Sequence, residues 1–387
     1  MQKTRKFWAY DFSQQQEIKQ EAFDNVKLKG RFYDDLSSLY YEFLGSPPHP
    51  SLKQLYGKEH TEPYVITFLN VLIDINTIKM LFYVIPNSKI ITLKLSSNLL
   101  EFANFEFLIN SVLNKPNNIF NFIYEWNSEF KYEGKLHSVN KNHPNYIKPL
   151  EEASGTPKIN IKDNNQEIGE VIAKYQEFIV KLSLSPKIEA LCLRGNFLGD
   201  ENAKVFFENL KTNNSLKVLN FFKNNLTSES ITVFCEMLIE NKKLEEINLG
   251  GNSFTNEDLK SIKNCIGKIQ LSPEDVEDYL KRQKEREAIV EKNKKLKAAK
   301  KPEDPVPPIE EVVQQGELYF IMKNTKLRTL NIMQNNFTEE CYETVIQMLD
   351  LNPDLLLTVD NRIFSKNLRD KLNHPHSKYS NRIYLAK

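Results

Sequence analysis

The residues of this 387-residue chain best suited to catalysis or metal binding are its cysteines and histidines. The four cysteines lie far apart without a Cys-x-x-Cys pair, which favours reduced thiols in a reducing compartment over zinc ligands or disulfides. Cys192 has no histidine in the neighbouring segments to serve as its base, so we do not expect a nucleophile there. His374 and His376 are separated by a proline, which makes a metal site between them improbable.

Sequence motifs for other chemistry are also absent. The chain contains no GxxxxGK[ST] or GxGxxG phosphate-binding loop, no HExxH metal motif and no GxSxG nucleophile motif. We therefore expect a non-enzymatic protein with no cofactor and no metal.

Charge and hydropathy exclude two further classes of partner. Lysine plus arginine (52) nearly cancels aspartate plus glutamate (51), so no overall field favours nucleic acid. The most apolar stretch, residues 64–85, is interrupted by Asn70, Asp74, Asn76 and Lys79, and we interpret it as a buried helix. The first residues lack the apolar run of a secretory signal. These features predict a cytoplasmic protein that binds neither nucleic acid nor a membrane.

The elements that position these side chains form an internal repeat. Its pattern is an apolar residue at positions 1, 4, 6 and 11 with asparagine at position 9, and copies start at Ile90, Ile188, Leu216, Leu244 and Leu327, with a weaker copy at Ile119. Three of these starts are 28 residues apart. Alternating apolar residues form a short strand with one buried face, and the segment after the asparagine has helical periodicity. Stacked repeats of this kind bury their apolar faces together in a curved solenoid.

Two sets of asparagines punctuate the repeat. A second asparagine lies three residues before each strand and ends the preceding helix, at Asn87, Asn213, Asn241, Asn324 and Asn352. Asparagines that follow the strands have side-chain amides able to bond backbone groups of neighbouring coils. We therefore assign a structural role to Asn98, Asn196, Asn224, Asn252 and Asn335.

The segment Leu191 to Ala203, with Leu193, Asn196 and Gly199, resembles the strand–turn–helix unit of ribonuclease-inhibitor-type leucine-rich-repeat proteins. The resemblance covers about residues 75–360 and implies an α/β fold. The expected fold is a horseshoe arc of parallel strands with outer helices, in about seven repeats of 28–29 residues with two insertions. The unit at 355–361 keeps an apolar strand but loses the asparagine register, as expected of a terminal cap.

Irregular spacing between repeats divides the chain. We expect an N-terminal helical arm or cap at 1–60, first repeats at 61–129, an excursion loop at 130–163, central repeats at 164–271, a charged helical insertion with a proline-rich return at 272–308, C-terminal repeats and cap at 309–365, and a basic tail at 366–387.

The charged insertion is the first candidate for partner binding. Ser272 followed by Pro273 starts a helix expected to reach about Lys301. This helix is either a solvated surface or a basic arm that contacts an acidic protein surface such as tubulin. The second interpretation assigns partner binding to Lys281, Arg282, Lys284, Arg286, Lys292, Lys294 and Lys295.

The outward side chains of the strands are the second candidate. They form rows along one sheet face, and arginine, aromatic and methionine residues are enriched in interface cores. Alternatively, the apolar members are covered by the chain's own insertion. The candidate partner-binding residues of this face are Arg194, Phe222, Met333, Asn220, Asn248 and Asn331.

The resemblance implies several functions, since this repeat family includes inhibitors, small-GTPase activators, actin regulators and ciliary axoneme subunits. We favour a non-enzymatic scaffold that holds other proteins of a multi-subunit complex, with the cilium or cytoskeleton as its setting. The axoneme offers three such places: the radial spoke, the nexin-dynein regulatory complex or the microtubule surface. A composition rich in Asn, Lys, Ile, Phe and Tyr, as in AT-rich protist genomes, supports this setting. The alternative is a small-GTPase activator or an actin or cortex regulator, although activators often carry an acidic tail and this tail is basic.

Overall fold

The fold was analysed in a computed structural model. It describes residues 18–23, 26–48, 65–69, 75–96, 100–101, 117–125, 129–132, 135–138, 177–298, 300–307, 309 and 312–386.

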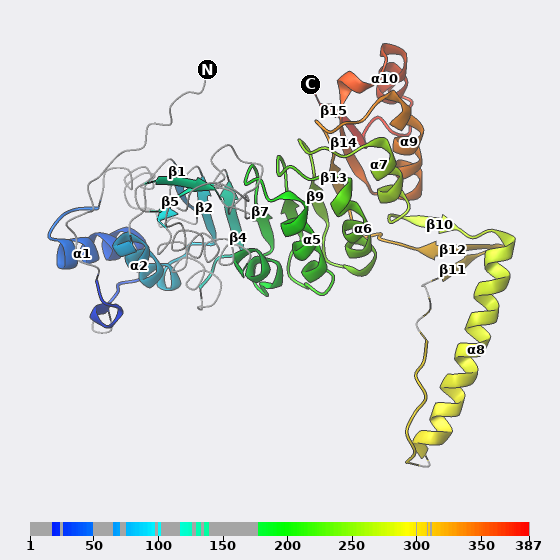
Figure 1. The fold of residues 1–387 in the computed structure, drawn as a ribbon, viewed down its shortest axis with the longest axis horizontal. Helices are drawn as coiled ribbons and strands as arrows, with labels where there is room; N and C mark the ends of the chain where they lie inside the picture. Colours follow the sequence, from blue (N-terminus) through cyan, green and yellow to red (C-terminus); the bar gives the residue numbers. More distant parts are fainter. Residues whose placement is uncertain are drawn as a thin grey trace, which may run out of the picture.

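A single nine-stranded sheet runs through the molecule, and every neighbouring pair of its strands is parallel. Six of the strands overlap the segments predicted from the repeat, which confirms the leucine-rich-repeat solenoid (Figure 1). In spatial order the strands are β1 (Val65–Leu69), β2 (Thr92–Ser96), β4 (Asn121–Glu125), β7 (Ala190–Cys192), β8 (Val218–Asn220), β9 (Glu246–Asn248), β13 (Thr329–Asn331), β14 (Leu356–Asp360) and β15 (Ile383–Ala386).

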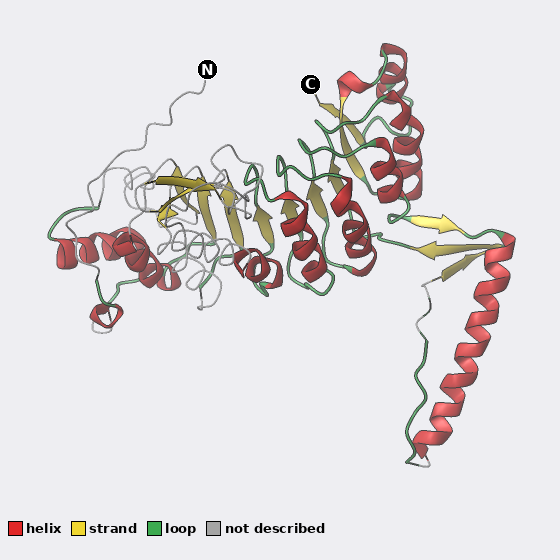
Figure 2. Ribbon diagram, viewed as in Figure 1, coloured by secondary structure: helices red, strands yellow, loops and turns green. Residues whose placement is uncertain are grey.

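Helices line one face of this sheet, as Figure 2 shows. They are α2 (Ile75–Val84), a helix described over 177–184, α5 (Gly199–Leu210), α6 (Ile231–Glu240), α7 (Asn256–Lys263) and α9 (Tyr342–Leu351). Short 3-10 turns adjoin three of them: η3 (Ile85–Asn87) follows α2, η4 (Ser228–Ser230) precedes α6 and η5 (Glu339–Cys341) precedes α9. A further turn, η6 (Asn361–Ile363), directly follows β14. The opposite face carries no helix in the described repeats and is called the open face below.

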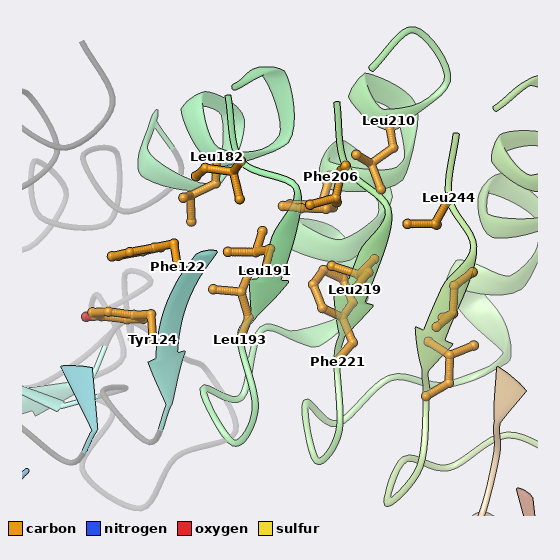
Figure 3. Close-up of a cluster of buried hydrophobic side chains, with 14 of the residues drawn as sticks. Phe122, Tyr124, Leu182, Leu191, Leu193, Phe206, Leu210, Leu219, Phe221 and Leu244 are labelled. Carbon is orange, nitrogen blue, oxygen red and sulfur yellow. The ribbon is translucent and has the colours of Figure 1, made fainter. Parts of the chain in front are cut away.

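The core lies between the sheet and its helices. Leu191, Leu219 and Ile247 occupy the same register position on neighbouring strands and are each about 1% exposed. The rings of Phe206 and Phe221 lie 5.0 Å apart between helix and strand (Figure 3). Every second strand residue therefore joins one continuous apolar layer, as the two-residue period of a strand requires.

The N-terminal unit differs in part from the sequence expectation. The stretch interpreted as one buried helix is a strand, β1, followed by the helix α2. Ile66 is fully buried and pairs with Leu93, so β1 extends the repeat array by one strand. Two further elements pack beside α2: helix α1 (Phe32–Leu44) and the turn η1 (Gln20–Phe23). The ring centroids of Phe23 and Tyr83 lie 5.3 Å apart there.

The C-terminal segment expected to be a basic tail also belongs to the solenoid. It forms helix α10 (Lys366–Asn373) and strand β15, which pairs with β14. Ile383 and Ala386 are buried, and the Arg382 guanidinium donates to the carbonyl oxygens of Leu349 (2.7 Å) and Asn352 (3.2 Å). At least one basic side chain of this segment, that of Arg382, therefore links the last repeat to the one before it.

Within the described ranges, two small sheets lie outside the main one. One contains β3 (Leu100–Glu101), β5 (Glu129–Tyr132) and β6 (Lys135–Ser138); the last two begin the expected excursion loop, and residues 139–163 lie outside the described residues. The other contains β10 (Lys268–Gln270), β11 (Val312–Gln315) and β12 (Leu318–Met322), all antiparallel. This second sheet is the base from which helix α8 (Pro273–Ala298) projects away from the body (Figure 1).

Candidate interaction surfaces

The open face is held in place by an asparagine ladder, which we define as Asn196, Asn224, Asn252 and Asn335. Asn224 Oδ1 accepts from the backbone N–H groups of Asn196 (3.1 Å) and Leu198 (3.3 Å), and its Nδ2 donates to the carbonyl oxygen of Leu193 (2.9 Å). Asn252 repeats the pattern toward Asn224, at 3.0 Å. The first three are at most 6% exposed, Asn335 is half-buried, and Asn98 lies outside the described residues.

A second ladder lies at the other end of the strands, where the helices end. Asn241 Oδ1 accepts from the N–H groups of Lys243 and Leu244, each at 2.8 Å, and its Nδ2 donates to the carbonyl oxygen of Asn213 (3.1 Å). Asn324 Nδ2 in turn donates to the carbonyl oxygen of Asn241 (3.2 Å). The sequence indicated only that these asparagines end the helices; the structure adds that they link neighbouring repeats.

The outward row at the centre of the open face keeps strict register across eight strands. Its members are paired in the order Lys94, Ile123, Cys192, Asn220, Asn248, Asn331, Thr358 and Tyr384. The last of these is 68% exposed. The row expected from strand alternation is therefore present. It continues onto β14 and β15 at one end, and at the other end Thr67 of β1 pairs with Lys94.

A charged cluster occupies the N-terminal part of this face. Glu125 Oε2 lies 3.2 Å from Lys94 Nζ and 3.3 Å from Ser96 Oγ, and Cys192 Sγ donates to Glu125 Oε1 at 3.1 Å. Burial alone would raise the pKa of Glu125, but the bonds from Cys192, Lys94 and Ser96 outweigh it and the pKa is lowered. Burial, reinforced by the Glu125 carboxylate, raises the pKa of Cys192 to about 12. This thiol is protonated near neutral pH and is a poor nucleophile.

Phe222 differs from the expectation of an exposed aromatic anchor. Its side chain is only 7% exposed. The Arg194 guanidinium lies 4.6 Å from the ring centroid, and a side chain at Gly250 would place its Cβ 2.9 Å from Phe222 Cδ2. The ring is thus packed between neighbouring repeats. These contacts come from the repeats, whereas the alternative interpretation had the charged insertion cover the ring. Met333 is half-buried, and its carbonyl oxygen accepts from the Gly251 N–H at 2.8 Å.

Lys223 was not singled out from the sequence, yet it belongs to this part of the surface. It is exposed, and its Nζ lies 5.6 Å from the Phe222 ring centroid. Its φ is 55°, and the equivalent positions Gly195, Gly251 and Gln334 also have positive φ. The glycines in two copies were the available signal that this turn needs a left-handed residue, which glycine adopts without steric cost.

The asparagines of the open face have a geometry distinct from that of the ladder. Asn220, Asn248 and Asn331 each accept, through Oδ1, the backbone N–H two residues later, at 3.0, 3.0 and 3.1 Å. Within the described part of the chain their Nδ2 groups make no hydrogen bond, and none of these nitrogen atoms is buried. Three donors therefore face the solvent side by side.

The arm, defined as residues 272–307, is built around α8 and the segment that returns along it. Asn293, 6% exposed, donates to the carbonyl oxygen of Asp304 (2.7 Å) and accepts its N–H (2.8 Å). Arg286 Nε donates to the carbonyl oxygen of Pro307 (3.2 Å), and Lys292 pairs with the Asp304 carboxylate (2.5 Å). The return segment is thus fixed to the helix by specific contacts.

These contacts divide the basic residues expected to meet a partner. Lys292 and Arg286 contact the return segment, Arg282 pairs with Asp278 (2.9 Å), and Lys294 pairs with Glu291 (3.3 Å). Lys281, Lys284 and Lys295 have no acidic partner among the described residues.

A small open cavity of about 550 Å³ lies beside α10, where it is lined by Tyr342, Tyr379, Lys371, His374 and His376, among others. The two imidazole centroids are 5.4 Å apart, and His374 Nδ1 accepts the backbone N–H of His376 at 3.2 Å. The described residues contain no group of three or more histidine, cysteine or acidic side chains placed to hold a metal ion.

Comparison with known proteins bears on the repeat. The family model described as "Leucine Rich repeat" matches residues 212–235, 240–263 and 323–340. Each match contains one strand of the main sheet (β8, β9 or β13), and the first two extend into the helix that follows, α6 or α7. A search of the curated proteins finds no significant match. Among the described residues, no helix has both the length and the hydropathy needed to cross a bilayer.

Proposed function

Because the chain is a leucine-rich-repeat solenoid, we propose that it is a non-enzymatic scaffold that holds other proteins of a large assembly. The observation that carries this proposal is the open face, a continuous sheet surface with outward side chains in register and no covering helix in the described repeats. Solenoids of this kind use such extended surfaces for binding.

The chemistry of the open face supports binding over catalysis. Its thiol, Cys192, has a pKa raised to about 12 and is bonded to a carboxylate, so it lacks the activation that covalent catalysis needs. The carboxylate beside this thiol, Glu125, is neutralised by Lys94 at 3.2 Å. Both groups serve to pack and orient the surface.

We further propose that the repeats are of the ribonuclease-inhibitor type and that the assembly is the ciliary axoneme. Support comes from the repeat length, the strand–turn–helix unit at Leu191 to Ala203 and the composition. In this setting the arm's basic residues, including Lys281, Lys284 and Lys295, contact an acidic protein surface such as that of tubulin.

The test is to tag the chain in ciliated cells and extract the cells with detergent. We expect the tagged chain to remain with the axoneme and to copurify with a defined set of subunits after salt extraction. Recovery in the detergent-soluble fraction without stoichiometric partners would contradict the proposal. A small-GTPase panel run beside it decides the alternative, because stimulation abolished by substituting one arginine would indicate an activator.

A further inference from the structure

We propose that the open face binds an acidic, extended polypeptide segment through a donor strip, defined as Asn220, Asn248, Asn331, Arg194 and Lys223. This inference rests on the proposed scaffold function and names the chemistry of the partner at its main surface.

The amide part of the donor strip offers hydrogen-bond donors only. Asn220 and Asn248 are paired in register on β8 and β9, and Asn331 follows on β13. Each Oδ1 is occupied by a backbone N–H of its own strand end, at 3.0–3.1 Å. This bond fixes which end of each amide points outward, so the Nδ2 groups face the solvent together. A ligand that satisfies them must supply acceptors.

The spacing of these donors suits carboxylates. Neighbouring strands lie about 4.8 Å apart, so adjacent Nδ2 groups have a similar separation. A carboxylate between two of them can accept from both at an ordinary distance of about 2.9 Å. Three amides in a row therefore offer two such positions, in addition to hydrogen bonds to peptide carbonyl oxygens.

The cationic part of the donor strip lies at its side, above one ring. Arg194 and Lys223 lie 4.6 Å and 5.6 Å from the Phe222 centroid, and this ring is buried against Gly250. A buried ring holds both cations near fixed positions, which lowers the side-chain entropy lost when they bind. Arginine adds planar, paired donors that match a carboxylate.

Acidic side chains mark the limits of the strip. Glu246 lies two residues before Asn248 on the same face of β9 and is exposed. Glu125 lies at the other side, on β4 next to β7, where Lys94, Ser96 and Cys192 bond its carboxylate. An acidic segment is therefore directed toward the carboxyl ends of β8, β9 and β13 and away from Glu246. With only two cations, Arg194 and Lys223, the strip suits a few carboxylates better than the continuous row of phosphates in a nucleic acid.

The test measures fluorescence anisotropy of a labelled peptide of alternating aspartate and glycine with the full-length chain. The diagnostic variant is Asn248→Asp, because aspartate keeps the oxygen that accepts the Gly250 N–H and replaces only the outward donor. We expect binding to weaken by about tenfold or more, the effect of losing one charge-assisted hydrogen bond. The double variant Arg194→Gln/Lys223→Gln should also weaken binding and reduce its dependence on salt.

The matched control is Gln347→Glu, which adds the same charge to an exposed position of α9 on the helix-covered side. Its Oε1 accepts from Lys263 Nζ at 3.2 Å, and the substituted carboxylate keeps this bond. Binding to this control should equal that of the unmodified chain. Equal loss in both variants would mean that only net charge matters, which would overturn the proposal.

Two comparison ligands complete the test. A peptide of alternating asparagine and glycine should bind much more weakly, and a single-stranded RNA should not compete; tighter RNA binding sensitive to Asn248→Asp would overturn the proposal. Unchanged affinity of the acidic peptide for Asn248→Asp would do the same. If copurifying subunits are lost with Asn248→Asp while the acidic peptide fails to bind, the ligand class is wrong and the scaffold function stands.

Discussion

At the scale of single residues, the asparagine ladder shows how one amide replaces backbone pairing between coils. Asn224 satisfies two N–H groups and one carbonyl oxygen that are buried away from water. Leaving a buried polar group unsatisfied costs about 1–3 kcal/mol. Each ladder asparagine satisfies several such groups, so its contribution to the free energy of unfolding exceeds that of a single hydrogen bond.

We therefore predict that Asn224→Ala lowers the free energy of unfolding by at least about 2 kcal/mol, because several buried backbone groups lose their partner. Urea and thermal unfolding followed by circular dichroism measure the change. The control is Asn214→Ala, since Asn214 is exposed and its amide bonds only the Thr212 carbonyl oxygen. Equal stability of the two variants would show that water replaces the ladder bonds at little cost.

Cys192 provides a second residue-scale prediction. Burial and the Glu125 carboxylate raise its pKa to about 12, so in the folded chain the thiol stays protonated well above its ordinary titration range. We expect iodoacetamide to alkylate Cys192 far more slowly in the native chain than in urea, as measured by peptide mass spectrometry. Glu125→Gln should accelerate the native reaction modestly, because burial is the larger cause. Native alkylation as fast as in urea would contradict the protonated, shielded thiol.

At the scale of elements, the sequence predicted the strands and helices of the regular repeat copies and missed the strands that depart from the repeat pattern. Strands and helices of the copies at 188, 216, 244 and 327 followed from one apolar period, since stacked units need the same buried positions. Strands β1 and β15 were missed because each is a short apolar run without a ladder asparagine, although the sheet gives it a partner.

The sequence predicted where the candidate residues of the open face lie, but not how exposed their side chains are. Alternation along the strands correctly placed Asn220, Asn248 and Asn331 in one outward row. The burial of Phe222 depends on contacts between repeats, namely Arg194 on one side and Gly250 on the other. The hydrogen bond from the Phe222 N–H to Asn220 Oδ1 depends on the turn at the end of the strand. Neither follows from residue spacing alone.

The arm carries a prediction about its internal order. The Asn293 side chain donates to the backbone carbonyl oxygen of Asp304 (2.7 Å) and accepts its N–H (2.8 Å), so Asn293→Ala should release the return segment. We expect faster tryptic cleavage after Lys300, since the bond after Lys301 precedes Pro302 and resists trypsin, with no change in the thermal unfolding of the body. The control is Gln283→Ala, whose side chain bonds only Glu287, also on α8. Unchanged cleavage in Asn293→Ala would mean that other contacts hold the segment.

At the scale of the whole molecule, the open face and the arm are separate surfaces. The arm begins at the small sheet β10–β12–β11 and projects away from the body (Figure 1). Helix α8 has 26 residues and so extends about 39 Å. Its charges are segregated, with Glu274, Asp275, Glu277 and Asp278 near the body and Lys292, Lys294, Lys295 and Lys297 near the tip. This order complements the helix dipole and also leaves a basic tip far from the sheet.

The last prediction asks whether the basic residues at the tip of the arm bind a partner or only stabilise helix α8. Replacing residues 272–308 with a short Gly/Ser linker should leave the unfolding of the repeats cooperative, because closing a surface loop costs little. Binding of the protein partners that copurify with the chain should weaken, and the part that is lost should be the part most sensitive to salt, since exposed charges are screened beyond about 8 Å at physiological ionic strength.

A charge reversal at the tip identifies the cause. Lys295→Glu/Lys297→Glu keeps the helix and the Asn293–Asp304 contacts, and it should reproduce most of the binding loss of the linker variant. The matched control, Lys242→Glu/Lys326→Glu, changes two exposed lysines on the repeat body by the same amount and should bind normally. Full retention of every partner by the linker variant would assign the lysines to helix stability alone, and partner binding would then rest on the open face or the ends of the solenoid.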